Sequence, residues 1–293
     1  MKPAGAGRPT VRSISAQRVV YDEAMVAPAQ GYSPGAQKPH AVMAAWHKAW
    51  PDLLVRPPLA ATLDELCRAH EARYVKDVLA GRITNGFGTV SQTVNSSLPY
   101  TSGAMLTAAR WALREGGAVA APVSGFHHAG WDSGEGFCTF NGLMVAALTL
   151  QAEQSGLRIG ILDYDYHYGN GTDDILDSLG CRDIVHITAG AYWKRPEQAH
   201  DFLDNIAHDL SKIAGCDLVL YQAGADPHID DPLGGYLTTT QLSTRDWKVF
   251  DGLRRHAIPV AWDLAGGYQQ PLSKVIEIHV NSLRAAIEVS AGG

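Results

Sequence analysis

Residues 160–172 read GILDYDYHYGNGT, and this stretch limits how the chain can fold. It opens on a short apolar run typical of a buried strand, and polar residues follow at once. In an extended strand alternate side chains share a face, so Asp163, Asp165 and His167 are expected on one side. Carboxylates at a buried strand end are costly unless they are paired or bound to a cation. The stretch favours a metal site, with an ordinary turn whose aspartates cap the next helix as the alternative.

Apolar runs and amphipathic segments alternate along most of the chain. Candidate buried strands are 118–123, 159–162, 184–187, 218–221 and 258–262, and helical patterns cover 102–115, 143–154, 200–214, 244–256 and 272–289. This alternation predicts an α/β fold with a mostly parallel sheet covered on both faces. With no linker or repeat, one domain over 1–293 is expected, with 1–15 flexible. Segments 31–38 and 85–99 are rich in turn-forming residues and are expected as loops.

Composition argues against several classes of protein. The net charge is −6 and no run of five Lys or Arg occurs, so neither nucleic acid nor an anionic membrane is an expected partner. No apolar stretch reaches the roughly 20 residues that span a bilayer, and no apolar segment follows the basic N-terminus. The four cysteines are far apart and form no CxxC pair. A cytoplasmic protein without disulfides is therefore expected.

The polar residues of interest follow the apolar runs. In an open parallel sheet, ligands bind at the carboxyl ends of the strands. Histidines 127 and 128, residues 163–167, Thr188, Asp226 and residues 263–268 each come soon after a predicted strand. Five segments distant in sequence are therefore expected to meet at one edge of the sheet.

The segment QAGADPHIDDPLGG, residues 222–235, supplies a further carboxylate for that edge. Together, Asp165, His167 and Asp226 would give a divalent ion two negative charges and one nitrogen ligand, leaving positions open for water and substrate. His228, Asp230 and Asp231 could be the ligands instead, but their sequence context favours loop and turn roles.

Two further segments carry groups suited to acid–base chemistry. Residues 125–141, GFHHAGWDSGEGFCTFN, place His127 and His128 before a glycine-rich loop, and imidazole titrates near neutrality. Residues 265–268, AGGY, place Tyr268 on a glycine turn, from which its hydroxyl could donate to a developing oxyanion.

Taken together, the four segments resemble the histone deacetylase superfamily, which includes lysine deacetylases, acetylpolyamine amidohydrolases and bacterial deacetylase-like amidohydrolases. The resemblance runs from about residue 98 to residue 283. It implies the arginase/deacetylase fold, with an eight-stranded, mostly parallel sheet. It also implies a zinc-dependent hydrolase that removes acetyl or other short acyl groups from acylated amines, either acyl-lysine or acylpolyamine. Fe²⁺ or Co²⁺ could replace zinc in such a nitrogen and oxygen site.

The same resemblance assigns roles to individual residues. Asp165, His167 and Asp226 would bind zinc. His127, held by Asp163, would act electrostatically or as an acid, and His128, partnered by Asn170, would be the general base that activates water. Tyr268 would polarise the acyl carbonyl, and Gly136 and Phe137 would line the acyl tunnel. A structural potassium ion would be held by Asp163, backbone oxygens of Asp165 and His167, and Thr188.

The sequence departs from the family pattern in three places, one of which is the N-terminal third, which matches the lysine deacetylases poorly. Tyr168 replaces a second histidine, on the face away from the ligands. Residues 192–197, YWKRPE, replace the family's Pro-Gly-Thr-Gly loop, so one wall of the substrate channel is rebuilt. Tyr192 or Trp193 could supply its second aromatic. A manganese ureohydrolase of the arginase type and a catalytically silent metal-binding module are the competing functions, and the native substrate, acyl length and oligomeric state are not predicted.

Overall fold

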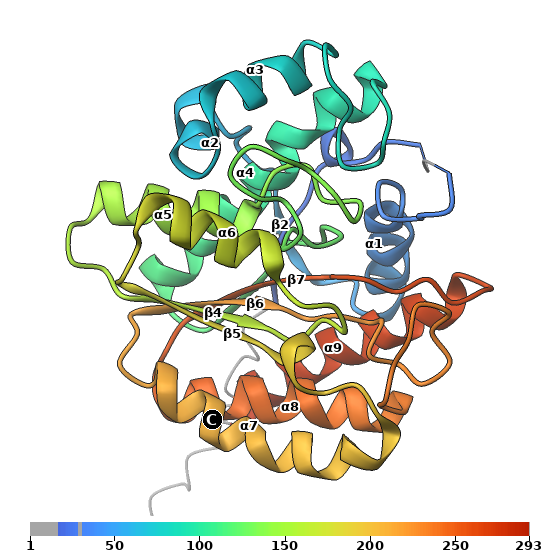
Figure 1. Cartoon of the computed structure of the whole chain (residues 1–293). Helices are drawn as coiled ribbons and strands as arrows, with labels where there is room; N and C mark the ends of the chain where they lie inside the picture. The colour runs from blue at the N-terminus through green and yellow to red at the C-terminus, as the bar shows by residue number, and fades with distance from the viewer. Residues whose placement is uncertain (1–16, 29–30, 293) are drawn as a thin grey trace, which may run out of the picture.

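A parallel β-sheet forms the centre of the molecule in the computed structural model, which describes residues 17–28 and 31–292 (Figure 1). The predicted flexible segment 1–15 lies outside the described residues. The strands are β1 (Arg18–Val20), β2 (Leu54–Arg56), β3 (Ala118–Ala120), β4 (Ile159–Asp163), β5 (Ile184–Thr188), β6 (Leu218–Gln222) and β7 (Val260–Asp263). They pair in the order β2-β1-β3-β7-β6-β4-β5, and every pair is parallel. The predicted parallel sheet and its five predicted strands are confirmed.

The described part of the chain forms seven strands, whereas eight were expected. At one edge, β2 is followed by Pro57 and Pro58, which lack the N–H donor needed to extend a ladder. At the other edge, the chain leaves β5 through the short 3-10 helix Ala189–Ala191 and reaches a long helix without another extended segment. Among the described residues, β2 and β5 are therefore the edge strands of the sheet.

Helices cover both faces of the sheet, as predicted. They are α1 (Lys38–Ala49), α2 (Leu63–Ala69), α3 (Ala72–Leu79), α4 (Gln92–Glu115), α5 (Gly142–Glu153), α6 (Asn170–Leu179), α7 (Ala199–Ile213), α8 (Thr239–Arg255) and α9 (Ser273–Ala291). Figure 1 shows α4, α5 and α6 on one side of the sheet and α7, α8 and α9 on the other. Successive strand residues belong to different hydrophobic cores: Val119 belongs to the core that contains residues of α4 and α5, and Ala120 belongs to the core that contains residues of α8 and α9. In the described residues, no helix is long and apolar enough to cross a membrane.

Helix α4 corrects the expected loop over 85–99, because the helix begins at Gln92. The Ser91 side chain caps it by accepting from the Val94 N–H, and the buried Val94 and Leu98 lie one turn apart on the face toward the core. Pro99 lies inside the helix, and its carbonyl oxygen accepts from the Ala61 N–H at 2.8 Å. Packing of the apolar face therefore outweighs the local turn-forming composition.

The last residues of four neighbouring strands form one row across the sheet. Thr188 pairs with Asp163, Asp163 with Gln222, and Gln222 with Asp263. Asp163, Gln222 and Asp263 are completely buried. The polar segments that follow the strands begin at this row, at the carboxyl edge of the sheet. The expected convergence at that edge is confirmed. The four cysteines are free, in agreement with the absence of a disulfide framework.

Candidate metal and catalytic centre

The chain bends immediately after β4, and this bend gathers its polar side chains. Asp163 Oδ1 accepts from the Asp165 N–H at 3.2 Å, and Asp165 Oδ1 accepts from the His167 N–H at 2.9 Å. Each aspartate thus satisfies the backbone two residues ahead, a local bond that favours turns over strands. The strand therefore ends at Asp163, and the expected extended alternation does not continue through His167.

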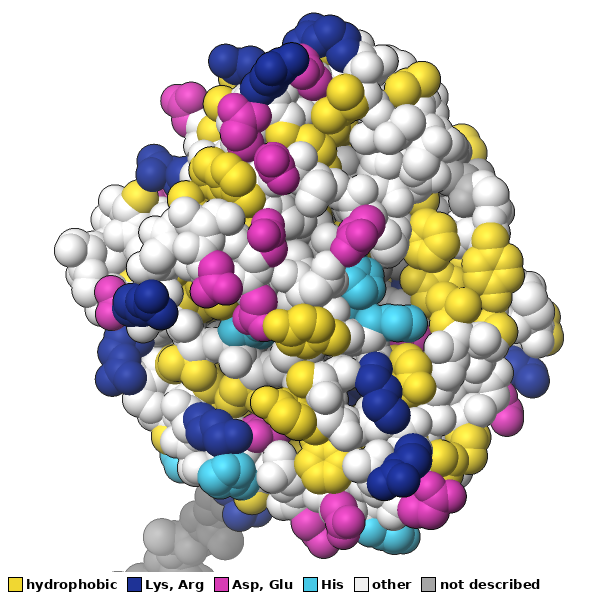
Figure 2. All heavy atoms as spheres, viewed as in Figure 1, with side chains coloured by type: hydrophobic (Ala, Val, Ile, Leu, Met, Phe, Trp, Pro, Cys, Tyr) yellow, Lys and Arg dark blue, Asp and Glu magenta, His cyan; other side chains and the backbone are white. Residues whose placement is uncertain are grey.

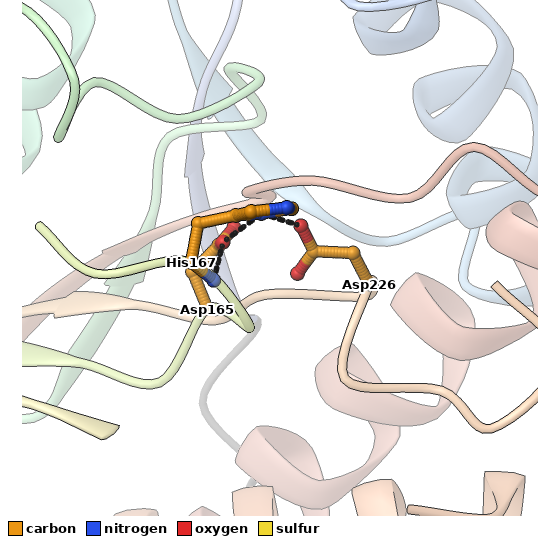
Figure 3. A group of neighbouring side chains, drawn as sticks. All are labelled: Asp165, His167 and Asp226. Carbon is orange, nitrogen blue, oxygen red and sulfur yellow. Dashed lines mark hydrogen bonds and ion pairs between the residues drawn. The ribbon is translucent and has the colours of Figure 1, made fainter. Parts of the chain in front are cut away.

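Asp165, His167 and Asp226 form a compact cluster, shown in Figure 3, whose potential ligand atoms all lie within 4.8 Å of one another. His167 Nδ1 lies 3.2 Å from Asp165 Oδ1 and 3.0 Å from Asp226 Oδ2. Asp226 comes from the loop after β6 and faces the bend after β4. Both carboxylates are buried, whereas the imidazole of His167 is partly exposed. The three predicted metal ligands are thus brought together.

The two buried carboxylates of this cluster favour the binding of a cation. Burial and the neighbouring Asp165 carboxylate raise the pKa of Asp226 to about 7. Burial opposes the charge of His167, but hydrogen bonds to Asp165 and Asp226 outweigh it and raise its pKa to about 10. His167 Nδ1 lies within hydrogen-bond distance of both carboxylates, so positive charge at this position is stabilised. A divalent ion bound by two carboxylate oxygens and an imidazole nitrogen could take its place, and this donor set suits zinc.

Two glycines let the backbone approach the cluster closely. A Cβ on Gly266 would lie 2.4 Å from the Asp226 carboxyl carbon, and one on Gly224 would lie 2.5 Å from the Asp165 Cα. Neither position tolerates a side chain without moving a ligand. The glycines of the segments 222–235 and 265–268 therefore have a packing role beside the carboxylates.

His127 forms a buried ion pair with Asp163, whose Oδ2 lies 2.7 Å from His127 Nδ1. Burial opposes the charge of His127, but Asp163 and Asp165 outweigh it and raise its pKa to about 9. Gln222 fixes the other oxygen of Asp163 by donating to Oδ1 at 3.0 Å. The second nitrogen of His127, Nε2, lies 3.6 Å from Asp165 Oδ1 and so faces the cluster.

His128 has a neutral partner instead. Its Nδ1 lies 2.6 Å from Asn170 Oδ1, at the first residue of α6. Burial and the neighbouring positive charge of His127 lower the pKa of His128. Of the two adjacent histidines, one is therefore stabilised as a cation and the other as a neutral base.

Tyr268 reaches the same centre from the turn after β7. Its N–H donates to Asp231 Oδ2 at 2.8 Å, and burial raises the pKa of its hydroxyl far above the usual value. A small cavity joins these groups, bordered by Ser124, Gly125, His127, His128, Gly136, Cys138, Asp165, His167, Asp226, Gly266 and Tyr268. Figure 2 shows histidine side chains gathered at a hollow on this face, with hydrophobic side chains beside it.

Aromatic rings surround Tyr268. The ring centroid of Phe137 lies 5.7 Å from that of Tyr268, and the ring of Tyr32 stacks on Tyr268 with 6.0 Å between the centroids. Trp193 packs against Phe202 in the core, and Tyr192 is 75% exposed. The ring that stacks on Tyr268 thus comes from the N-terminal third of the chain, which sequence reasoning left without a role.

The alternative ligands make other contacts. His228 Nε2 lies 2.9 Å from Thr239 Oγ1, and its Nδ1 accepts from the Asp230 N–H at 3.0 Å. Asp231 accepts from the backbone of Leu233 and of Tyr268. These residues shape the loop after β6, in agreement with their expected turn roles.

The proposed potassium ligands lie beside this centre. Thr188 Oγ1 accepts from the Gly169 N–H at 3.2 Å.

His186 is a further residue beside Asp163 that the sequence did not indicate. Its Nε2 lies 3.9 Å from Asp163 Oδ2, and its Nδ1 lies 2.7 Å from Asp173 Oδ1. A histidine inside a strand carries no local signal for such a contact.

The sequence did not indicate that two cationic side chains, Lys38 and Arg245, are buried near the site. Lys38, the first residue of α1, donates to the carbonyl oxygens of Leu264 and Gly266 beneath the Tyr268 turn. Arg245 of α8 donates from one nitrogen to the carbonyl oxygens of Tyr164, at 3.0 Å, and Gly224, at 2.6 Å. It thereby ties together the two loops that carry Asp165 and Asp226. Buried Lys and Arg are rare unless paired. Arg245 also pairs with its neighbour Asp246 at 2.8 Å, but the carbonyl oxygens that the two cations hold are distant in sequence.

Several known proteins resemble this chain in sequence. The model of the histone deacetylase domain matches residues 36–188. An uncharacterized protein of Picosynechococcus is 31% identical over 247 residues, covering 75% of this chain and 80% of that protein. Histone deacetylase 2 of Arabidopsis thaliana is 27% identical over 193 residues, covering 59% of this chain and 48% of that protein. Acetylpolyamine amidohydrolase 1 of Pseudomonas aeruginosa is 27% identical over 177 residues, covering 48% of each chain.

A solved structure confirms the fold. The crystal structure of the HDA15 HD domain superposes with a TM-score of 0.76, covering 96% of this chain and 89% of that one at 22% identity. The chain spans about half the length of the two characterised relatives above. The domain match and the Picosynechococcus relative each extend over more than half of this chain. The chain therefore belongs to the histone deacetylase domain family.

Proposed function

We propose that the chain is a metal-dependent hydrolase of linear amides that removes acetyl or other short acyl groups from acylated amines. The observation that carries this proposal is the meeting of an Asp165–His167–Asp226 cluster with two histidines and a tyrosine around one cavity. Such a combination supplies a cation site, a base and an oxyanion donor, which are the parts that amide hydrolysis needs.

The two histidines divide the proton chemistry. His128 is held neutral by burial and by the charge of His127, so its free nitrogen can take a proton from the attacking water. His127 is held as a cation by Asp163, so it stabilises negative charge that develops beside it. The protonated histidine then delivers a proton to the leaving amine.

Tyr268 stabilises the tetrahedral oxyanion. Because burial raises its pKa, the phenol keeps its proton and can donate a hydrogen bond to the developing negative oxygen. A divalent ion, when bound, polarises the acyl carbonyl and lowers the pKa of water. Asp165, His167 and Asp226 would hold that ion, which we propose to be zinc, with Fe²⁺ or Co²⁺ as alternatives.

The names of the relatives suggest two substrate classes, acyl-lysine and acylpolyamine. We further propose that Gly136 and Phe137 line the acyl-binding channel and that a structural potassium ion lies at Asp163, the backbone of Asp165 and His167, and Thr188. The arginase-type alternative is disfavoured, because His127 and His128 pair with Asp163 and Asn170 rather than completing a second metal cluster.

The test is hydrolysis by metal-depleted protein, before and after addition of Zn²⁺, Fe²⁺ or Co²⁺, with acyl-lysine peptides and acylpolyamines of graded acyl length. We expect turnover only after metal addition. Asp226→Asn should lose bound metal, measured by elemental analysis, and lower kcat/KM by a factor of about 1,000.

Asp230→Asn is the matched control, because Asp230 is an exposed aspartate of the same loop. It should retain both metal and activity. Failure of the wild-type protein to cleave any acyl amide with any of the three ions would refute the proposed function.

A further inference from the structure

A tight turn packs against His128, the proposed general base, and borders the same small cavity as the metal cluster. Residues 135–138 form it: the Cys138 N–H donates to the Glu135 carbonyl oxygen at 2.8 Å. Gly136 and Phe137 have φ values of +54° and +66°. Positive φ at both central positions is characteristic of a type I′ turn. A Cβ on Gly136 would lie 2.4 Å from His128 Cδ2, so the turn packs directly on the imidazole.

The turn also places a carboxylate on the partner of that histidine. Asn170 Nδ2 donates to Glu135 Oε1 at 2.6 Å, while Asn170 Oδ1 lies 2.6 Å from His128 Nδ1. Three side chains thus form one continuous hydrogen-bonded network, His128–Asn170–Glu135, in which two come from the segment 125–141 and Asn170 comes from the start of α6.

The donors and acceptors of these hydrogen bonds have a fixed order. An ionised carboxylate only accepts hydrogen bonds, so Glu135 must face the NH₂ group of Asn170. The amide oxygen of Asn170 must then face His128, whose Nδ1 has to carry the proton. Nε2 is left with its lone pair free, which is the form that a general base requires. Without Glu135, the amide could turn over and select the opposite tautomer.

Backbone contacts hold the histidine segment and the start of α6 next to each other, so that these three side chains can meet. The Thr172 N–H donates to the His127 carbonyl oxygen at 3.1 Å, and a Cβ on Gly171 would lie 2.5 Å from the backbone of His128 and Ala129. The start of α6, which carries Asn170, is therefore packed against the histidine segment, and Glu135 supplies the part of the geometry that the backbone leaves free.

We propose that Glu135 is a positioning residue for the general base: it orients Asn170 and thereby fixes the tautomer of His128. This inference rests on the proposed hydrolase function. The carboxylate acts through Asn170 and touches no reacting atom.

The activity test is a double-mutant cycle with Asn170. Glu135→Gln can present either its oxygen or its NH₂ group to Asn170 and so no longer fixes the direction of the amide. It should lower kcat about tenfold with little change in KM, roughly the free energy of one orienting hydrogen bond. In an Asn170→Asp background, the new carboxylate accepts from His128 in either orientation and is repelled by Glu135. There, Glu135→Gln should leave kcat unchanged or raise it. An equal loss in both backgrounds, or no loss in the wild-type background, would overturn the proposal.

Asp132→Asn controls for removing one negative charge from the same exposed loop, and kcat should be unchanged. A second readout does not depend on turnover. In ¹⁵N spectra of histidine-labelled protein, His128 should show a protonated Nδ1 in the wild type and a mixture of tautomers in Glu135→Ala. An unchanged His128 spectrum in Glu135→Ala would also overturn the proposal. Inactivity of the wild type together with the expected spectra would refute only the hydrolase function.

Discussion

The ammonium of Lys38 donates to the carbonyl oxygen of Leu264 at 2.5 Å, although the two residues lie 226 positions apart. It also donates to the Gly266 carbonyl oxygen, two residues before Tyr268. Burial lowers the pKa of Lys38 to about 8, against the opposing effect of Asp226 and Asp165. A buried cation at the first residue of α1 thus anchors the turn that carries Tyr268, the proposed oxyanion donor.

Lys38→Met is therefore expected to affect both stability and catalysis. Two buried carbonyl oxygens lose their donor, so the free energy of unfolding should fall by about 2 kcal/mol. The loosened turn should lower kcat at least tenfold, because small displacements of a catalytic donor are costly. Denaturant unfolding and steady-state kinetics measure the two effects. Lys48→Met, at an exposed position of the same helix, should change neither; a Lys38→Met enzyme with wild-type kcat would exclude the anchoring role.

Comparing Gly136→Ala with Gly180→Ala should separate the effect of backbone strain from that of a clash with His128, the proposed general base. A Cβ on Gly136 would meet the His128 ring, whereas a Cβ on Gly180, also at positive φ, would meet nothing within 4 Å. Gly180→Ala should lose about 1 kcal/mol of stability, the cost of a side chain in left-handed backbone, and Gly136→Ala should lose at least as much because its Cβ also displaces the His128 ring. Only Gly136→Ala should lower kcat, by about 100-fold. Equal kcat values in the two variants would show that His128 tolerates the displacement.

His70 should make the stability of the protein depend on pH. It is buried, with Nδ1 donating to the Gly130 carbonyl oxygen and Nε2 accepting from the Asn141 N–H, both at 2.8 Å. Burial lowers its pKa to about 4. Because the unfolded chain takes up this proton near pH 6.5, the stabilisation is complete above that pH and is lost as the pH falls toward 4.

The expected loss from His70 across that window is about 3 kcal/mol. Urea unfolding at several pH values, in the presence of a chelator, measures it. His70→Gln should unfold more readily at neutral pH and show a shallower decline on acidification. His47→Gln, at an exposed position, should keep the wild-type slope. A slope unaltered by His70→Gln would assign the acid sensitivity to other groups.

Much of the fold could be predicted from the sequence, because its evidence is local. Short apolar runs between amphipathic segments indicated five of the strands and the parallel sheet. Parallel strands bring their carboxyl ends to one edge whatever their order, so the polar residues after each run were expected to converge. Asp165, His167 and Asp226 meet as expected, and so do the pairs His127–Asp163 and His128–Asn170.

Other features were outside the reach of local patterns. The segment 85–99 looked like a loop, yet its last part is helical, because Val94 and Leu98 gain more from burial than Pro99 costs. The bend after β4 replaced an extended strand, because aspartate side chains satisfied the backbone ahead of them. Sequence composition does not show which of these competing interactions is stronger.

The sequence by itself determined which chemical groups are available and which strand end each one follows. Only the tertiary structure decided that Lys38 supports the Tyr268 turn, that Tyr32 stacks on Tyr268, and that Glu135 orients Asn170. Those pairs are tens to hundreds of residues apart, and nothing in their local sequence specifies a partner. Burial excludes water from these groups, so each donor or acceptor must find its partner within the folded chain, and packing selects which one it meets.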